Sequence, residues 1–323
     1  MSLQRVFGAP LDPQKATLVA IGNFDGVHRG HQAVLAQALS AAKSEGVAPL
    51  VLTFDPHPAV VLGRGVMPAL TSLERKIELL CRQGPELAVA VEPFTPALAS
   101  TEPADFVAEL LVTALHARLV LVGEDFRFGR GRGGDFALLD RLGKQHGFRA
   151  LGATLERDEQ GPISSTRIRG ALSAGNLGEV THLLGRPHAL GGVVVRGQGR
   201  GRSVGVPTAN LEGIGEALPP HGVYAVLVDQ QQGDRFVALA GGVANFGVRP
   251  TLGAGPSFEV HLFDSDRDLY GQALRVHLLS RLREERKFAG VDELRAQIGR
   301  DIAAARALTA ERKPDPSARG AWY

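Results

Sequence analysis

Short apolar runs recur along the first half of the chain, and longer segments with helical spacing of apolar residues separate them. The runs lie at 16–22, 49–54, 87–94, 117–123 and 149–156, and each predicts a buried strand. The intervening segments predict helices at about 31–44, 72–84, 103–116 and 135–147. Because strands that are apolar along their whole length alternate with helices, we predict a parallel sheet covered by helices on both faces.

The second half of the chain has a different pattern. Strand-like segments follow one another through glycine-rich turns at 191–199, 222–230, 235–243, 257–264 and 273–282. Since no helix separates them, they predict a smaller domain built as an antiparallel β-barrel. A last helix is expected at 291–308, with one apolar stripe made of Val291, Leu294, Ile298 and Ile302. We therefore predict one domain over 1–185, a second over 186–308 and a disordered tail over 309–323.

The composition is that of a globular protein with room for two moderate domains. The chain has 323 residues, of which 44% are hydrophobic and 22% charged, and its formal net charge is +2. This balance favours neither nucleic-acid nor membrane binding, so we expect neither partner. Cys81 is the only cysteine, which excludes an intrachain disulfide and a cysteine-rich zinc site. The sequence has no signal-peptide core and no membrane-spanning run, and we expect a cytoplasmic location.

The candidate chemistry begins with the stretch IGNFDGVHRGHQAVL at 21–35, where a predicted strand leads through a glycine-rich turn into a predicted helix. Free backbone N–H groups and the helix dipole favour an anion at such a turn. His28 and His31 are three positions apart, so their rings would lie one above the other if the turn is helical, and Gly30 leaves room for a phosphate. A His-x-x-His pair by itself is more often two surface histidines without a catalytic or binding role. A zinc pair would need a cysteine cluster or a His-Glu-x-x-His pattern to complete it.

Three further stretches of this half carry polar or glycine-rich residues. ISSTRIRGAL at 163–172 places hydroxyl groups and arginines at a predicted helix start. TFDPHP at 53–58 and GEDFRFGRGRGGD at 123–135 each follow a predicted strand, so both should lie at the sheet edge where open α/β sheets bind ligands. Taken alone, SST would be an ordinary helix cap and FGRGRGG a flexible basic loop.

Together, GNFDGVHRGH and ISSTRIRGAL resemble the HxGH nucleotidyltransferase superfamily, in the form found in bacterial bifunctional riboflavin kinase/FAD synthetases. The resemblance implies a Rossmann-like α/β domain that transfers an adenylyl group from ATP to FMN, with His28 and His31 stabilising charge on the phosphates. It also implies that Phe54, His57 and Phe128 bind the flavin. The ATP-binding residues that it implies are Gly22, Phe24, Asp25, Gly30, Gly123, Asp125, Ser164, Ser165, Thr166 and Arg169.

In the barrel half, the main candidate is the stretch GQGRGRSVGVPTANL at 197–211. If PTAN is extended, Thr208 and Asn210 project to the same side, and their neutral oxygen atoms suit a Mg²⁺ ion whose charge is balanced by phosphate. The alternative is a polar loop that closes the barrel. The stretch resembles the flavokinase signature, which implies that Thr208 and Asn210 bind the metal and that Asn210 is catalytic. By the same resemblance, the ATP contacts are Gly199, Gly201, Gly205, Pro207 and Thr208.

Alternation in SFEVHLFD at 257–264 places Glu259, His261 and Phe263 on one face of a strand. A lone glutamate in a strand is usually just solvated. The family resemblance, carried by FEVHLFD and LYG, implies that Glu259 is the catalytic base that takes the proton from the 5′-hydroxyl of riboflavin. It also implies that GGVANFGVRPT at 241–251 and REERKF at 283–288 lie near the substrate. The flavin contacts expected in these two segments are Asn245, Arg249, Arg283 and Phe288.

The resemblance as a whole implies a bifunctional enzyme that converts riboflavin to FMN and FMN to FAD, with ATP as cosubstrate and Mg²⁺ as the required ion. Two alternatives stay open: an enzyme that keeps only one of these activities, and an RNA-binding protein that uses its arginine-rich loops. The intact HxGH, SST and PTAN motifs and Glu259 argue against the first. The near-neutral net charge argues against the second. The sequence does not indicate an oligomeric state.

Overall fold

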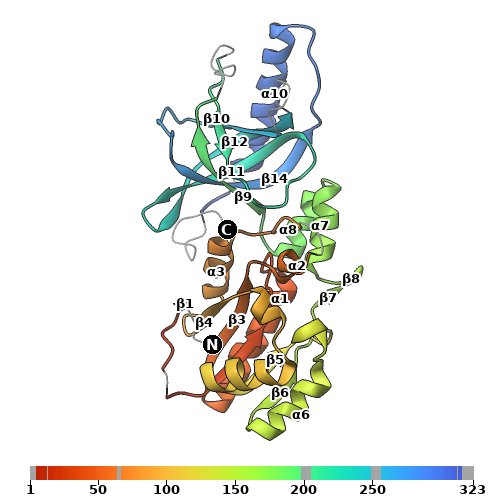
Figure 1. The fold of residues 1–323 in the computed structure, drawn as a ribbon. Coiled ribbons are helices and arrows are strands. Elements are labelled where there is room, and N and C mark those ends of the chain that lie inside the picture. The colour runs from red at the N-terminus through yellow and green to blue at the C-terminus, as the bar shows by residue number, and fades with distance from the viewer. Residues whose placement is uncertain are drawn as a thin grey trace. The chain divides into compact units, whose positions relative to one another are not determined.

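The computed structural model describes residues 5–12, 14–63, 67–197, 205–248, 256–310 and 312–314. By its internal contacts the chain divides into two units, Met1–Ser165 and Thr166–Tyr323 (Figure 1). Helices α7 (Ser165–Ser173) and α8 (Leu177–Leu184) lie between this division and the predicted domain boundary at 185/186. That boundary stays a prediction.

The first unit is built on a six-stranded sheet with the order β1-β4-β3-β2-β5-β6. All neighbouring strands pair in parallel except the edge strand β1, which is antiparallel to β4, so the predicted parallel sheet is confirmed. The strands are β1 (Val6–Gly8), β2 (Thr17–Ile21), β3 (Ala48–Asp55), β4 (Ala88–Pro93), β5 (Ala117–Val122) and β6 (Arg149–Gly152). A small hairpin, β7 (Arg157–Asp158) and β8 (Gly161–Pro162), stands apart from the sheet.

Helices cover the sheet on both faces. Every residue of the central strand β2 is buried, so the side chains on both of its faces need cover from the helices. Side chains of β2 and β3 on one face pack with Phe106 and Leu110 of the π-helix η1 (Phe106–Ala114). Helix α1 (Arg29–Glu45) contacts the same two strands and buries Leu35 and Ala38. The other helical segments of this unit are α2 (Pro58–Val61), α3 (Leu73–Cys81), α4 (Pro96–Ala99), α5 (Pro103–Asp105), the 3₁₀ turn η2 (Arg130–Arg132) and α6 (Phe136–His146).

The order of the strands places a topological switch point between β2 and β5. Strands β3 and β4 extend the sheet to one side of β2, whereas β5 and β6 extend it to the other side. The loops that follow β2 and β5 therefore diverge at the carboxyl edge of the sheet, where open α/β sheets bind ligands. These two loops contain the predicted motifs at 21–35 and 123–135.

The second unit contains a closed antiparallel barrel, as the sequence predicts. Its strand order is β10-β13-β12-β11-β14-β9, and β9 pairs with β10 to close the ring. Tyr224, Val260 and Val276 are fully buried in its interior. The strands are β9 (His188–Val195), β10 (Ala209–Glu212), β11 (Gly222–Gln232), β12 (Arg235–Val248), β13 (Pro256–Leu262) and β14 (Ala273–Arg283).

Helix α10 (Val291–Thr309) packs on the outside of the barrel. Ala305 and Ile302 contact Ala225 and Phe263, which project outward from the strands and the turn that follows β13. Val291 is 54% exposed, so it does not pack with the rest of the predicted apolar stripe. The helix ends at Thr309, the first residue of the predicted tail, and 311 and 315–323 lie outside the described residues.

In the part of the chain that the structure describes, none of the helices combines the length and the apolar character that a membrane span requires.

Candidate active sites

The turn after β2 brings the two predicted catalytic histidines together at the start of α1. His28 is the N-cap of this helix, and its Nδ1 accepts a hydrogen bond from the backbone N–H of His31 at 3.2 Å. The two rings stack with their centroids 3.6 Å apart and their planes 18° apart. His28 is buried and His31 is half-buried. Both imidazoles therefore lie at the positive end of a helix dipole, where anions are stabilised.

Direct contacts join this turn to the second predicted phosphate motif. Gly30 lies so close to the 163–165 segment that a Cβ at this position would be 2.9 Å from the carbonyl oxygen of Ile163. The Ser165 hydroxyl donates a hydrogen bond of 2.9 Å to the carbonyl oxygen of Asp25. The two motifs, separated by more than a hundred residues in the sequence, are thus adjacent in the fold. Ser164 precedes α7, whereas Thr166 and Arg169 are α7 residues that group with the second unit.

The turn itself is held in an unusual backbone conformation. Phe24 and Val27 have φ angles of 49° and 39°, in the left-handed region that non-glycine residues seldom adopt. Asp25 is buried, and its Oδ1 accepts a hydrogen bond from the backbone N–H of Leu70 at 2.9 Å. The carboxylate of Asp25 therefore fastens the turn to the 70–71 segment, a structural contact that the sequence did not indicate.

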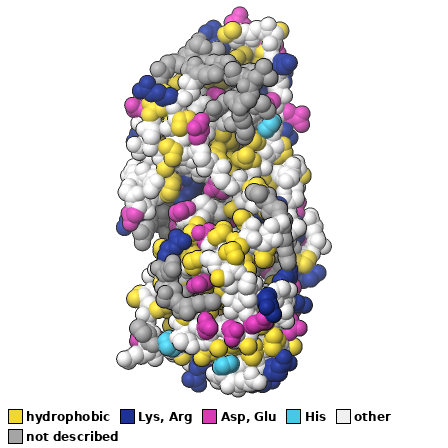
Figure 2. Space-filling model, in the orientation of Figure 1, with side chains coloured by type: hydrophobic (Ala, Val, Ile, Leu, Met, Phe, Trp, Pro, Cys, Tyr) yellow, Lys and Arg dark blue, Asp and Glu magenta, His cyan; other side chains and the backbone are white. Residues whose placement is uncertain are grey.

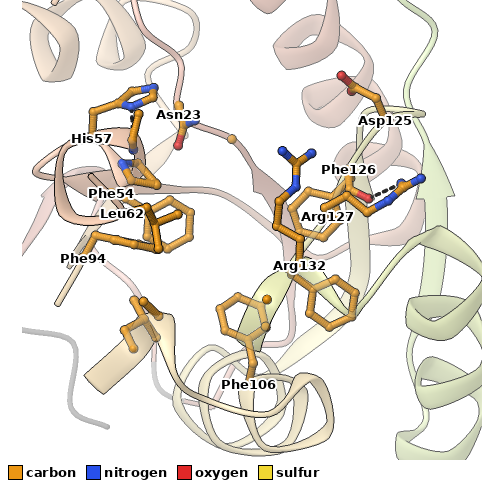
Figure 3. A pocket seen from close by; sticks show the side chains of 18 residues that line it. Asn23, Phe54, His57, Leu62, Phe94, Phe106, Asp125, Phe126, Arg127 and Arg132 are labelled. Atoms are coloured by element: carbon orange, nitrogen blue, oxygen red, sulfur yellow. Dashed lines mark hydrogen bonds between the residues drawn. The ribbon is translucent and has the colours of Figure 1, made fainter. Parts of the chain in front are cut away.

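A cavity of about 380 Å³ opens at the carboxyl edge of the sheet (Figure 3). Gly22, Phe54, His57, Asp125 and Phe128, all predicted from the sequence, contribute to its wall. His28, His31 and Gly123 are not among the lining residues. Phe126, which the family resemblance of the 123–135 stretch assigns to the nucleotide site, also lines the cavity. The residues that sequence reasoning did not assign to the site are Asn23, Pro58, Ala59, Leu62, Phe94, Leu98, Ala99, Phe106, Arg127, Gly129, Gly131 and Arg132.

Lys76 of α3 contacts the backbone of two residues that line this cavity, and the sequence analysis missed it. Its Nζ donates to the carbonyl oxygen of Phe54 at 3.1 Å and to that of Asn23 at 3.4 Å, so one cation holds both loops. Burial lowers the pKa of Lys76, and the nearby Asp25 and Asp55 act in the opposite direction. The signal available in the sequence was a lysine on the apolar face of an amphipathic helix, with Leu73, Leu79 and Leu80 three or four positions away.

In the barrel, strand register aligns three predicted residues in one row. Asn210 of β10 pairs with Glu259 of β13, and Glu259 pairs with Asn245 of β12. Paired residues on neighbouring strands project to the same face, so these side chains are neighbours on the outer face of the barrel. The row continues through Val223 of β11 to Arg283 of β14.

Hydrogen bonds orient the Glu259 carboxylate within this row. The Thr208 hydroxyl donates to its Oε2 at 3.2 Å, and the Ser257 hydroxyl donates to its Oε1 at 3.1 Å. A Cβ at position 197 would be 2.2 Å from Nδ2 of Asn210, so Gly197 leaves the space that the amide occupies. Thr208 therefore contacts Glu259 directly, and Asn210 lies beside Glu259 in the strand register. Metal binding by Thr208 and Asn210 stays a prediction.

Two cavities meet at Thr208. The larger, of about 560 Å³, lies between the outer face of the barrel and α10, and its wall includes Glu259, Asn245 and Phe288. The smaller, of about 330 Å³, includes Pro207 and the 265–270 turn. Asn210 and Gly205 line neither cavity. The predicted contacts Gly199, Gly201 and Arg249 lie outside the described residues.

Arg283 lines the larger cavity but its guanidinium is already engaged. Nε and Nη2 donate to Oδ2 of Asp301 on α10 at 3.0 and 2.9 Å, and the group lies 5.6 Å from the ring centroid of Phe288. This pair ties α10 to β14 at the edge of the cavity. A contact between Arg283 and a flavin stays a prediction, whereas its anchoring of the helix is direct.

Replacing Asp301 with asparagine should lower the free energy of unfolding by about 1–3 kcal/mol, because it leaves a largely buried guanidinium without its carboxylate. The measurement is urea denaturation of the full chain. Asp264→Asn is the matched control, since Asp264 also pairs with an arginine of α10, Arg306, but on the exposed surface. Equal denaturation midpoints for the two variants would contradict the anchoring role.

Comparison with known proteins agrees with both halves of the structure. The FAD synthetase family model matches residues 11–167, and the riboflavin kinase family model matches residues 184–309. A bifunctional riboflavin kinase/FMN adenylyltransferase of Escherichia coli K12 is 40% identical over 304 residues, which cover 94% of this chain and 96% of the relative. Its counterpart in Bacillus subtilis is 37% identical over 299 residues, covering 90% of this chain and 92% of the relative.

A solved structure also resembles most of the chain. A crystal structure from Streptococcus pneumoniae, described as a macrolide-efflux protein, matches with a TM-score of 0.79 and 32% identity, and the match covers 91% of this chain and 94% of that one. The motifs, the fold of each unit and the full-length relatives lead to one conclusion. The chain belongs to the family of bifunctional riboflavin kinase/FMN adenylyltransferases, with an FAD synthetase domain in its α/β half and a riboflavin kinase domain in its barrel half.

Proposed function

We propose that this protein catalyses both reactions of its family in separate sites. In the barrel, the γ-phosphoryl group of ATP passes to the 5′-hydroxyl of riboflavin and gives FMN. In the α/β unit, the adenylyl group of a second ATP passes to FMN and gives FAD and diphosphate. The observation that carries the proposal is common to both units: an apolar cavity ends at residues of a nucleotide-binding motif.

In the barrel, the two cavities that share Thr208 support a transfer between two bound molecules. Riboflavin would occupy the larger cavity, with its rings against Phe288 and Asn245, and ATP the smaller one. The 5′-hydroxyl and the γ-phosphate would then meet beside Glu259. Its carboxylate takes the proton of the attacking hydroxyl, while the hydrogen bonds from Thr208 and Ser257 hold it in place.

Magnesium fits the oxygen-donor chemistry of this site. The hydroxyl of Thr208 and the amide oxygen of Asn210 are neutral oxygen ligands beside Glu259, and Mg²⁺ takes most of its remaining ligands from phosphate and water. No group of three or more His, Cys, Asp or Glu side chains that could hold a metal occurs among the described residues. When bound, the ion would neutralise charge on the transferred phosphoryl group.

In the α/β unit, an oxygen of the FMN phosphate attacks the α-phosphorus of ATP, and the bond to diphosphate breaks. No covalent enzyme intermediate is needed, so catalysis rests on positioning and charge stabilisation. His28 and His31, at the start of α1, would donate hydrogen bonds to the phosphates. Ser164 and Ser165 would hold the departing diphosphate, and Phe54, His57 and Phe128 would hold the flavin. A role for Thr166 and Arg169 with the diphosphate stays a prediction.

The direct test gives the purified full-length chain riboflavin, ATP and Mg²⁺ and separates FMN from FAD over time. FMN should appear first and FAD after it, and chelation of the metal should stop both. FMN that accumulates without FAD, or FMN supplied directly that is not converted, would favour an enzyme with a single activity.

RNA binding remains the alternative from another class. Positive and negative side chains are interspersed on the face of each unit that Figure 2 shows, which does not favour an extended polyanion. A salt-sensitive affinity for RNA at physiological ionic strength would support it.

A cytoplasmic location of the protein stays a prediction.

A further inference from the structure

The loop after β5 carries three arginines that differ in their surroundings. Arg130 pairs with Glu102 at 2.5 Å, and Nη1 of Arg127 donates to the carbonyl oxygen of Phe126 at 2.8 Å. The guanidinium of Arg132 forms no hydrogen bond or ion pair with any residue in the described ranges. It lines the cavity of the α/β unit, and in Figure 3 it points into the open space between Asn23 and Asp125.

The backbone that presents Arg132 is fixed in place. Phe128 and Gly134 exchange two backbone hydrogen bonds of 3.1 and 2.9 Å, which close the loop at its base. The backbone N–H of Arg130 donates to the carbonyl oxygen of Thr101 at 2.7 Å. Arg132 itself has a φ of 62°, in the left-handed region that non-glycine residues seldom adopt. These hydrogen bonds give the loop a defined path that places Arg132 at the cavity.

The aromatic part of the cavity does not distinguish riboflavin from FMN. Its aromatic wall, which includes Phe54, Phe94 and Phe106, suits a flat ring system. Riboflavin and FMN have the same rings and the same ribityl chain, and they differ only in the phosphate. That phosphate carries between one and two negative charges at neutral pH, and a guanidinium pairs with it through two parallel hydrogen bonds.

We propose that Arg132 binds the phosphate of FMN and thereby selects the phosphorylated flavin over riboflavin for adenylylation. The inference rests on the proposed function of the α/β unit. The aromatic wall of the cavity suits the ring system of FMN, and the guanidinium of Arg132 suits its phosphate. The guanidinium also directs the nucleophilic phosphate to the end of the cavity where Gly22 and Asn23 lead toward the histidine turn.

The first test measures FAD formation by the full-length protein from FMN and ATP. Arg132→Ala should raise the KM for FMN roughly 10- to 100-fold, the effect of losing hydrogen bonds to a charged group, and should change the KM for ATP less than about twofold. Arg132→Lys should recover part of the loss. Arg130→Ala is the matched control from the same loop, and it should behave like the parent protein.

The second test separates the phosphate from the rest of the flavin. 5′-Deoxyriboflavin keeps the rings and most of the ribityl chain but can be neither phosphorylated nor adenylylated, so it serves as a competitive inhibitor against FMN. Its inhibition constant should be the same for Arg132→Ala and the parent. Three results would each overturn the inference. The inhibition constant could rise in Arg132→Ala as much as the KM for FMN does, the KM for ATP could rise in place of the KM for FMN, or the KM for FMN could stay unchanged. If the parent protein itself made no FAD, the proposed function would fail first.

Discussion

Replacing Glu259 with glutamine should stop the conversion of riboflavin to FMN and leave the conversion of supplied FMN to FAD intact. Glutamine keeps the shape of the side chain and can still accept a hydrogen bond from Thr208, but it cannot take a proton from the flavin hydroxyl. Loss of a general base typically lowers kcat by about 10²- to 10⁴-fold. We expect an effect of that size on kcat for FMN formation.

The measurement is an assay of each half-reaction on the same preparation. Ser257→Ala is the control, because it removes one hydrogen bond to Glu259 and leaves the carboxylate in place, so its effect on kcat should be much smaller. Asn210→Ala should also impair the kinase reaction alone, since Asn210 lies next to Glu259 in the row. A Glu259→Gln protein that still makes FMN at the parent rate would exclude Glu259 as the base.

Replacing both His28 and His31 with alanine should have the opposite outcome, stopping FAD formation and leaving FMN production nearly normal. The stacked rings lie at the N-terminus of α1, where they can donate to phosphate oxygens as charge develops. Removal of one such donor typically lowers kcat by about 10²- to 10³-fold. The double variant should therefore lose at least that much in the adenylylation assay.

His28 also caps α1, so part of its effect could come from a weakened helix. Loss of a cap costs about 1 kcal/mol, which circular dichroism during thermal unfolding would detect. His28→Asn keeps a capping acceptor and should retain the parent stability while still losing FAD formation. His146→Ala, at an exposed position in the last turn of α6, is the neutral control. Simultaneous loss of both activities in the double variant would indicate a folding defect instead of a separate site.

The local patterns in the sequence determined the architecture of both halves. Continuous apolar strands such as 16–22 can be satisfied only where both faces are covered, which is why they predict a parallel sheet with helices on each side. Glycine-rich turns between strands without helices predict the barrel for an equally local reason. The exposed Val291 shows the limit of this reasoning, because periodicity identifies an apolar stripe but does not say where the surface that it packs against ends.

The residues that make up the two candidate sites could be predicted only in part from the sequence. The sequence by itself placed the histidine turn, the SST segment, PTAN and Glu259 in chemically sensible contexts, because each motif carries its own backbone geometry and its own polar groups. Only the tertiary structure brought Phe94 and Phe106 to the same cavity as Phe54 and placed Lys76 against the backbone of Phe54. The wall of a cavity is formed by segments that are far apart along the chain, and a local sequence pattern does not predict which of these segments meet.

Register illustrates the same division within the barrel. The alternation in 257–264 indicated which side chains share a face, but not which neighbours they would meet. Pairing across three strands decided that Asn210, Glu259 and Asn245 form one row, and a shift of one residue would have turned Glu259 to the opposite face. The sequence thus determined the residue types that we propose for the chemistry. The fold decided their partners, because strand pairing and loop packing depend on contacts between distant parts of the chain.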